Sequence, residues 1–372
     1  MFWDYMQPVK IRFGNGRAGE IHKLANELGC RRGLLVSDPF FLSNGLADKI
    51  VNESRGAICA IFGDLSSNPD VSEADACAGM IRGQKIDFVA ALGGGSALDC
   101  AKAAATLALT NDSVRKYHGT GEPVPQVHLP VIAVPTTAGT GSEVTCVSVL
   151  TDRETGKKSP IVSDGFYPSY AVIDPELTYS MPPNVTAGTG IDVLSHALEG
   201  YWSKGHQPVC DACAVHAARL VFQYLYRAYE DPGDPLAREK MAEASVMAGL
   251  AFTLPKTTAS HACSFPLTNI YHIPHGEACG LTLDYFLKIN AGGENGRIEG
   301  MAQMIGFGGA DHMAEAIHNL KAKMGLRNDL KDLNLTDTQI DELVKVSRHP
   351  NLYNNPVDIT DDMLYEMYES MR

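Results

Sequence analysis

The stretch DFVAALGGGSALDCAKAAATLA, residues 87–108, decides the fold of this chain. It begins with a short apolar run that predicts a strand and continues into an alanine-rich pattern that predicts a helix. Between them, Gly93, Gly94 and Gly95 let the backbone approach a ligand closely, while Ser96 and the helix N-terminus offer donors to phosphate. The run is not GxGxxG, so the standard dinucleotide fingerprint is absent, and a tight strand-to-helix turn explains the glycines equally well.

Similar apolar runs alternate with helical patterns up to about residue 180. The other predicted strands are GLLVSD (33–38), AICAIFGD (57–64) and VIAVP (131–135). Amphipathic segments lie between the predicted strands, for example at residues 18–29 and 71–83. Strands that alternate with helices predict parallel βαβ units with right-handed crossovers.

The pattern changes after MPP (181–183). Long helical patterns follow at residues 210–230, 235–252 and 311–325, with hardly any strand-like alternation. We therefore expect a boundary near residues 181–186, with an α/β dinucleotide-binding domain over residues 1–182 and an all-helical, metal-binding domain over residues 183–372.

Two more features of the first half suggest a nucleotide ligand. Asp38 ends a predicted strand, where a carboxylate can accept hydrogen bonds from an adenosine ribose and repel a 2′-phosphate, which would favour NAD over NADP. A helix N-cap explains Asp38 equally well. The loop VPTTAGTGSEVT (134–145) is rich in hydroxyls and glycine, which suits a ligand lying along the backbone or a plain turn.

Four residues of the second half have the chemistry of a metal site. Asp192 and His196 are four residues apart in a predicted helix, so both side chains leave one face. His261 and His275 flank a Pro-containing stretch that we expect to be irregular and to fold back toward that face. A carboxylate with three imidazoles suits Fe(II) or Zn(II), although any one of the four could be an ordinary polar residue.

Composition limits the classes of function. The chain has 372 residues, is 45% hydrophobic, and contains no apolar run long enough for a membrane span. Its N-terminus lacks the pattern of a signal peptide, and nine scattered cysteines are typical of reduced thiols in a cytoplasmic protein. A net charge of -13 argues against nucleic acid as a partner.

Together these motifs resemble the iron-containing (group III) alcohol dehydrogenases over nearly the whole chain. The resemblance rests on GGGSALDCAKA, PTTAGTGSEVT, VIDPELTYSMP, GIDVLSHALEGYWS and the block from His261 to His275. It implies the fold shared with dehydroquinate synthase, with the active site in the cleft between the two domains, and a homodimer. It also implies hydride transfer between NAD(H) and a small aldehyde or primary alcohol.

The resemblance also assigns residues. In the family the metal is held by an Asp, a His four residues on, and two His residues 14 apart, which Asp192, His196, His261 and His275 match. Asp38 and Asn68 are expected at the adenosine end of the cofactor, and Gly95 and Ser96 at the pyrophosphate. The full predicted cofactor-binding set is Asp38, Asn68, Gly94, Gly95, Ser96, Asp99, Thr136, Thr137 and Lys158, with Lys157 as the neighbouring alignment of the last.

The chain departs from the family at one position of the expected substrate pocket. Many members carry a His four residues after the third ligand, close to the nicotinamide and often assigned to proton relay, where this chain has Phe265. His272 could substitute for it, but an ordinary loop histidine is the preferred interpretation. WDYMQPVKIRFGNG and SFPLTNIYHIPHG further resemble a subgroup that reduces phosphonoacetaldehyde, although the sequence does not show which Arg or Lys would bind the phosphonate.

Two alternatives of other classes stay open. Dehydroquinate-synthase-like lyases share the two-domain plan and use NAD and a metal for an elimination, but their usual first metal ligand is Glu and not Asp as at Asp192. A non-catalytic binding protein of the same fold is the second alternative; Phe265 favours it and the four metal-ligand residues argue against it.

Overall fold

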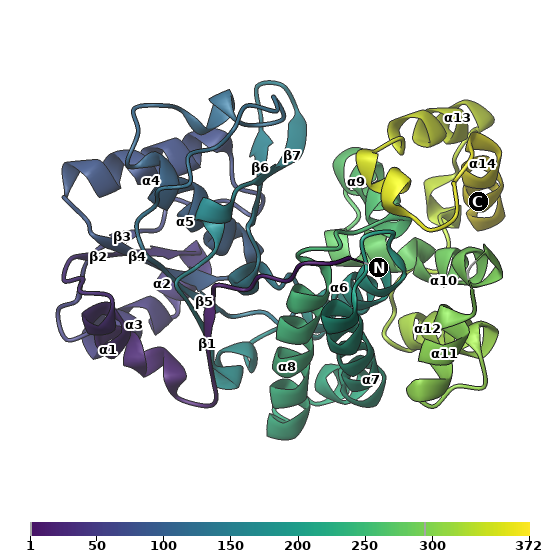
Figure 1. Ribbon diagram of the computed structural model, residues 1–372, viewed down its shortest axis with the longest axis horizontal. Coiled ribbons are helices and arrows are strands. Elements are labelled where there is room, and N and C mark those ends of the chain that lie inside the picture. The colour runs from purple at the N-terminus through teal and green to yellow at the C-terminus, as the bar shows by residue number, and fades with distance from the viewer. Residues whose placement is uncertain (1, 294) are drawn as a thin grey trace. The chain divides into compact units, whose positions relative to one another are not determined.

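A computed structural model describes residues 2–293 and 295–372. The chain divides into two compact units (Figure 1). The α/β unit spans Met6–Tyr179, and the helical unit spans Ser180–Arg372 together with the first residues of the chain up to Tyr5.

A six-stranded parallel sheet forms the centre of the α/β unit, in the order β1-β8-β5-β4-β2-β3. The strands are β1 (Lys10–Phe13), β2 (Gly33–Ser37), β3 (Ile58–Phe62), β4 (Phe88–Gly93), β5 (Val131–Pro135) and β8 (Tyr170–Ile173). The four strands predicted from the apolar runs are confirmed as β2, β3, β4 and β5, and the predicted parallel arrangement is confirmed as well.

Helices cover both faces of this sheet, as a parallel sheet requires. The helices are α1 (Ile21–Glu27), α2 (Pro39–Ser43), α3 (Leu46–Glu53), α4 (Val71–Gly83) and α5 (Gly95–Leu107). Alternate residues of β4 point to opposite faces: Val89 and Ala91 pack in the core that contains α4 and α5, whereas Ala90 and Leu92 pack in the core that contains α1 and α3. This explains why the strand is apolar without a break.

The α/β unit also contains an antiparallel hairpin that the sequence did not predict. It pairs β6 (Val147–Asp152) with β7 (Lys157–Val162) outside the main sheet. Alternate residues of β6 are buried, including Leu150, which joins the core beside α4 and α5. The hairpin lacks a long apolar run because one of its sides is only partly covered.

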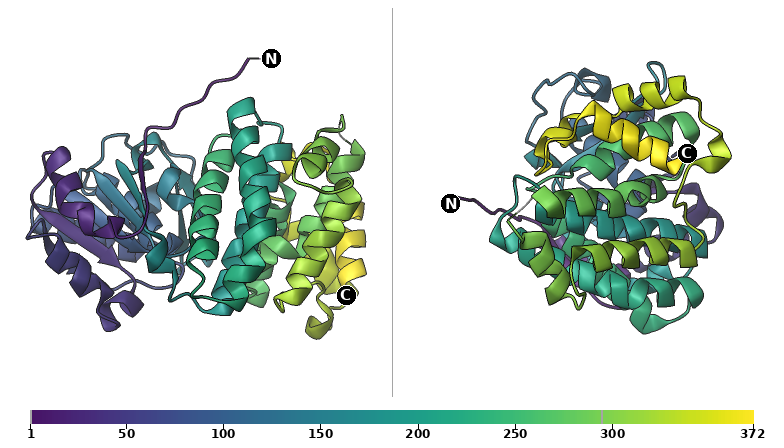
Figure 2. Two further views of the ribbon diagram at one scale, coloured as in Figure 1. Left: turned by 90° about the horizontal axis from the view of Figure 1, so that it is seen from below. Right: turned by 90° about the vertical axis from the view of Figure 1, so that its right-hand side faces the viewer.

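The second unit is built from helices that run side by side (Figure 2). Its helices are α6 (Pro183–Trp202), α7 (Pro208–Glu230), α8 (Pro235–Phe252), α9 (Ala259–Tyr271), α10 (His275–Gly293), α11 (Arg297–Met304), α12 (Ala310–Lys323), α13 (Asp337–Val346) and α14 (Asp361–Met371). Every residue of α6 from Gly190 to Trp202 is buried, so α6 is the central helix of this unit. The predicted all-helical character is confirmed.

One expectation about this unit was wrong. Most of the stretch between His261 and His275 is not irregular, because α9 continues from Ala259 to Tyr271 with Pro266 inside it. Only three residues separate α9 from α10, and the first of them, His272, ends α9 in the left-handed conformation with φ of 56°. A proline costs a helix one hydrogen bond, and the buried residues around Pro266 compensate for it here.

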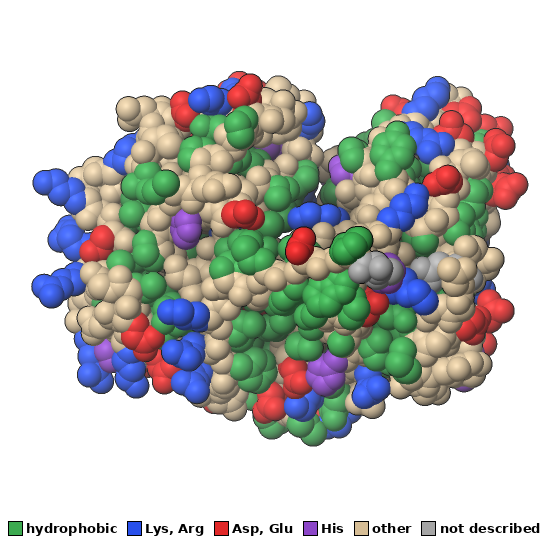
Figure 3. Space-filling view, in the orientation of Figure 1, with side chains coloured by type: hydrophobic (Ala, Val, Ile, Leu, Met, Phe, Trp, Pro, Cys, Tyr) green, Lys and Arg blue, Asp and Glu red, His purple; other side chains and the backbone are tan. Residues whose placement is uncertain are grey.

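None of the described helices has the length and apolar character that crossing a membrane requires. On the face drawn in Figure 3, acidic and basic side chains are interspersed over each unit. All nine cysteines are free thiols.

Candidate active site

Three neighbouring strands of the α/β unit end where the sequence predicted a nucleotide. Asp38 follows β2, Gly94 follows β4 and Thr136 follows β5, so these residues meet at the carboxyl edge of the sheet. The strand order reverses between β2 and β4, because β3 lies on one side of β2 and β5 on the other side of β4. Open parallel sheets bind ligands at such a reversal.

Asp38 and the glycine run are in direct contact. Asp38 stands at the N-cap position of α2, but its side chain makes no capping bond there. Its Oδ2 instead accepts the N–H of Gly94 at 3.3 Å. Burial raises the pKa of Asp38, and the Gly94 N–H partly opposes this. A Cβ at Gly93 would lie 2.3 Å from Asp38 Oδ2 and 2.7 Å from the Cβ of Ala97, so a side chain at position 93 would displace its neighbours.

The hydroxyl-rich loop lies over the same glycines. The N–H of Thr136 donates to the carbonyl of Gly93 at 3.0 Å. A Cβ at Gly94 would meet the Thr137 side chain at 3.5 Å, and one at Gly95 would meet Thr140 at 3.0 Å. The glycine run and the loop therefore form one continuous surface at the N-terminus of α5.

Hydrogen bonds connect three further predicted residues at the N-terminus of α5, namely Asn68, Ser96 and Lys158. The backbone N–H of Asn68 donates to Ser96 Oγ at 3.3 Å, and Lys158 Nζ donates to Asn68 Oδ1 at 2.8 Å. Lys158 lies on β7, so the unpredicted hairpin brings a cation to the helix N-terminus. A cation and a helix N-terminus together favour a phosphate.

Asp99 is placed differently from the other predicted cofactor residues. It is buried, and its two carboxylate oxygens accept from Ser142 Oγ at 2.5 Å and from the backbone N–H of Val149 at 2.8 Å. The Nζ of Lys102 lies 3.8 Å away and also donates to Ser142. Asp99 thus holds α5 against β6 through the interior of the unit.

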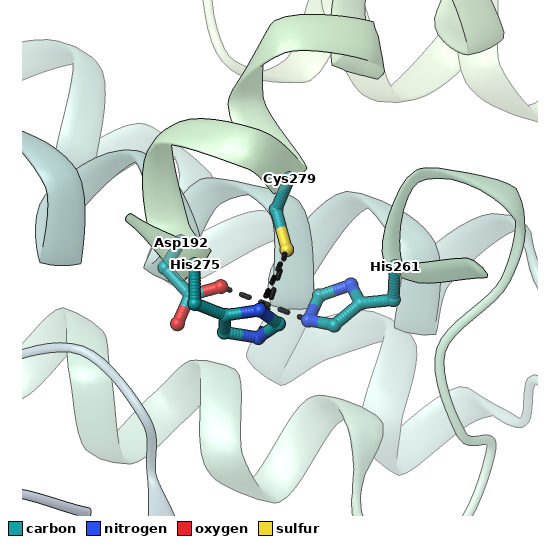
Figure 4. Close-up of side chains that lie close together, drawn as sticks. All are labelled: Asp192, His261, His275 and Cys279. Carbon is teal, nitrogen blue, oxygen red and sulfur yellow. Dashed lines mark hydrogen bonds and ion pairs between the residues drawn. The ribbon is translucent and has the colours of Figure 1, made fainter. Parts of the chain in front are cut away.

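In the helical unit, three of the four predicted metal-binding side chains converge together with Cys279 (Figure 4). Donor atoms of Asp192, His261, His275 and Cys279 all lie within 4.8 Å of one another. Asp192 Oδ1 is 3.6 Å from His261 Nε2. The fourth predicted ligand, His196, faces the same group, with its Nε2 3.0 Å from His261 Nε2 and its Nδ1 3.9 Å from Asp192 Oδ2.

The backbone explains how three helices reach one point. Asp192 and His196 are one turn apart on α6. His275 is the first residue of α10, and the next residue is Gly276. A Cβ at Gly276 would lie 2.1 Å from the carbonyl oxygen of Gly188 and 3.1 Å from the Cβ of Asp192, so only glycine lets α10 begin this close to α6.

Glu199 is a functional residue that the sequence reasoning missed. It is fully buried, and its Oε2 accepts a hydrogen bond from His261 Nδ1. Its Oε1 accepts from the Thr258 N–H and hydroxyl, and from the N–H groups of Ser260 and His261, at 2.8 to 3.3 Å. Glu199 therefore both caps the N-terminus of α9 and orients the His261 ring. Asp192, His196 and Glu199 occupy positions i, i+4 and i+7 of α6, which places them on one face of the helix. This spacing was the sequence signal that could have indicated Glu199.

Cys279 was also missed. It lies four residues after His275 on α10, with its sulfur 3.7 Å from His275 Nε2. The thiol is buried, and burial raises its pKa. The i, i+4 spacing from His275 was the available signal.

Aromatic rings flank the cluster. Phe252 stacks on His196 with ring centroids 4.2 Å apart, and Phe265 lies nearly parallel to His275 with centroids 6.3 Å apart. Phe265 also contacts His349, a residue the sequence reasoning missed, with centroids 4.7 Å apart. His272 is exposed at the end of α9.

The chemistry of the donors fits a divalent metal. The bond to Glu199 places the proton of a neutral His261 on Nδ1, so the Nε2 lone pair faces the Asp192 carboxylate and His196. Burial opposes a charged His261, but Cys279 and Glu199 raise its pKa well above the ordinary value. Carboxylate oxygen with imidazole nitrogen is a donor set for Fe(II) or Zn(II).

Comparison with known proteins decides the family. The family model for iron-containing alcohol dehydrogenase matches residues 8–175, and the model for the C-terminal part of the same family matches residues 186–372. The chain belongs to the iron-containing alcohol dehydrogenase family. It is therefore an oxidoreductase, and the family predicted from the sequence is confirmed.

Relatives within this family are similar in sequence to this chain over nearly its whole length. Alcohol dehydrogenase 4 of Schizosaccharomyces pombe is 33% identical over 367 residues, covering 96% of this chain and 86% of that protein. The 1,3-propanediol dehydrogenase of Klebsiella pneumoniae is 33% identical, covering 95% of each. The crystal structure of sulfoacetaldehyde reductase from Bifidobacterium kashiwanohense in complex with NAD+ is 63% identical, covers 100% of this chain and 99% of that chain, and superposes with a TM-score of 0.98.

Proposed function

We propose that this iron-type alcohol dehydrogenase reduces sulfoacetaldehyde with NADH and yields 2-hydroxyethanesulfonate and NAD+. The observation that carries the proposal is the 63% identity, along the full chain, to a sulfoacetaldehyde reductase. A sulfonate on a two-carbon aldehyde is the same kind of substrate, a small aldehyde with a tetrahedral anionic group, as the phosphonoacetaldehyde suggested by the sequence.

For the cofactor, we propose that the edge of the sheet around Asp38, Gly94, Ser96, Thr136 and Thr137 holds NAD(H). The contact between Asp38 and Gly94 and the cation of Lys158 at Asn68 support an adenosine end and a phosphate end on one surface. The carboxylate of Asp38 disfavours a 2′-phosphate, which supports NAD over NADP. Asp99 contributes by fixing α5 against β6.

For the metal, we propose that Asp192, His196, His261 and His275 are the ligands, with iron as the family's metal and zinc as its substitute. When bound, the metal polarises an aldehyde carbonyl as a Lewis acid and NADH supplies the hydride. Glu199 keeps His261 in the tautomer that presents Nε2 to the cluster. Phe252 stacks on His196 and Phe265 lies beside His275, so two apolar rings border the cluster and lower the local polarity, which strengthens the electrostatic interactions there.

The overall reaction consumes one proton, which the oxygen of the product takes up. Phe265 cannot carry a proton, so that position is not a proton relay. His272 is exposed at the end of α9, which supports its interpretation as an ordinary loop residue.

The test is a comparison of aldehydes with the purified protein, reconstituted with Fe(II) under anaerobic conditions. The rate of NADH oxidation is measured with sulfoacetaldehyde, phosphonoacetaldehyde, propionaldehyde and glycolaldehyde. We expect kcat/KM for sulfoacetaldehyde to exceed the others by about tenfold or more, since a matched anionic group adds ~1.4 kcal/mol or more of transition-state binding. Equal or higher kcat/KM for the two uncharged aldehydes would overturn the proposed substrate, and preference for the phosphonate would replace it by the second candidate.

We further propose a homodimer in the cytoplasm. The family resemblance supports the dimer, and the nine free thiols support a reducing compartment. Sedimentation velocity of the purified protein tests the dimer, and a single species with the mass of one chain would contradict it.

A further inference from the structure

His349 lies one aromatic ring away from the metal-ligand cluster. Its ring contacts Phe265, which in turn lies nearly parallel to His275. It precedes the short 3₁₀ segment Pro350–Asn354 and is half-buried. All three rings belong to the helical unit, so their arrangement does not depend on the α/β unit.

The hydrogen bond at one ring nitrogen fixes where His349 carries its proton. Nδ1 accepts the backbone N–H of Asn351 at 3.2 Å, as an N-cap of the segment. In the neutral ring the proton is then on Nε2, which becomes a donor. Burial lowers the pKa of His349, the Asn351 side chain partly opposes this, and nearby His261 lowers it further. Burial thus favours the neutral ring, which presents one N–H at Nε2.

The cationic side chains around this segment are bound to other groups. Arg348 donates to Asp361 at 2.6 Å and to the carbonyl of Ile359 at 2.8 Å. Lys204 donates to the carbonyl of Tyr353 and to Asp358, both at 3.1 Å. His349 is a nitrogen donor whose ring contacts Phe265.

We propose that His349 determines specificity by donating its Nε2–H to the anionic group of the substrate. In this arrangement the aldehyde carbonyl lies at the cluster and the sulfonate lies beside His349, whose ring centroid is 4.7 Å from that of Phe265, while Phe265 is 6.3 Å from His275. Phe265 then packs against the carbon chain, and His349 binds the sulfonate oxygens. This inference rests on the proposed function, and it identifies the group that recognises the anion.

Two substitutions distinguish the role of His349 as a hydrogen-bond donor from its role as the N-cap of the 3₁₀ segment. Asn in His349→Asn keeps an acceptor for the Asn351 N–H but removes the distal donor. Gln in His349→Gln places an amide N–H near the position of Nε2 but loses the cap. Inhibition of propionaldehyde reduction by ethanesulfonate, an unreactive sulfonate, is measured for both variants and the wild type, together with their thermal midpoints. Ethylphosphonate in the same assay distinguishes a phosphonate from a sulfonate site.

We expect the inhibition constant of ethanesulfonate to rise about tenfold or more in His349→Asn and to be intermediate in His349→Gln. The ratio of kcat/KM for sulfoacetaldehyde to that for propionaldehyde should fall by a similar factor. An inhibition constant within about twofold of wild type in His349→Asn would overturn the role of His349, as would a wild-type enzyme that ethanesulfonate does not inhibit. Failure of sulfoacetaldehyde to react, with the His349 effect on inhibition intact, would instead reject the proposed substrate and keep the anion site.

Discussion

At the scale of single residues, Glu199 shows how one buried carboxylate serves both the fold and the site. Its two oxygens accept hydrogen bonds from the N-terminus of α9 and from the ring of His261. Because all of these partners are donors, the position requires an acceptor at both oxygens.

The substitution Glu199→Gln tests this dual role. One end of the amide is a donor, so it must face another donor either at α9 or at His261. We expect metal affinity to fall about 10- to 100-fold and the free energy of unfolding to fall by about 1–3 kcal/mol. Chelator competition and thermal melts of the metal-free protein measure the two effects.

Glu243→Gln is the matched control, because Glu243 also pairs with a histidine, His216 at 2.7 Å, away from the cluster. Metal affinity should be the same as wild type in this control. Unchanged metal affinity in Glu199→Gln would show that Glu199 is not needed to position His261.

Gly93 provides the corresponding test at the cofactor edge. Gly93→Ala would place a Cβ 2.3 Å from Asp38 Oδ2, so Asp38 and the start of α5 must move. We expect the dissociation constant of NADH, measured by fluorescence titration, to rise about tenfold or more. In Gly79→Ala, the control, the Cβ meets nothing within 4 Å inside helix α4, and the change should stabilise the fold by about 0.5–1 kcal/mol. If Gly93→Ala binds NADH as tightly as the wild type, the glycine run is not part of the cofactor site.

At the scale of elements, the sequence predicted the strands and helices that carry long apolar patterns. It failed where tertiary contacts decide the outcome. Only alternate residues of β6 and a single residue of β7 are buried, so the hairpin has no long apolar run. Helix α9 continues through Pro266 although proline usually ends a helix. Both failures lie beside predicted site residues, since Lys158 is on β7 and His261 is on α9.

The short 3₁₀ element Ser142–Val144 gives a pH-dependent prediction. Its Glu143 is 2% exposed, and burial raises the pKa from 4.5 to about 7. The folded state then binds more protons than the unfolded state between these values, so stability falls as pH rises from about 4.5 to 7. We expect Glu143→Gln to abolish this loss, so that the free energy of unfolding above pH 7 is about 3 kcal/mol higher than in the wild type.

Urea unfolding at pH 5 and pH 8 measures the effect: the variant should gain stability over wild type at pH 8 but hardly at pH 5. Glu122→Gln makes the same chemical change at an exposed position and should gain at neither pH. Equal gains at both pH values in Glu143→Gln would contradict a raised pKa.

At the scale of the whole molecule, the resemblance to a family supplied what local patterns could not. The cluster joins residues of α6, α9 and α10, and no periodicity relates Asp192 to His261 or His275. Glu199 and Cys279 could have been found from their helical spacing, because each lies on the same helix face as a predicted ligand. His349 carries no such signal, since only folding brings it to Phe265.

The most direct test of the account is the metal dependence of sulfoacetaldehyde reduction. Metal-free protein is titrated with Fe(II) under anaerobic conditions, and NADH oxidation is followed in the presence of sulfoacetaldehyde. We predict that activity is absent at first, rises with added iron, and saturates at about one ion per chain, with His261→Ala showing little response because a ligand is lost. Full activity of the metal-free protein, or saturation of His261→Ala at the wild-type level, would contradict a catalytic metal held by Asp192, His196, His261 and His275.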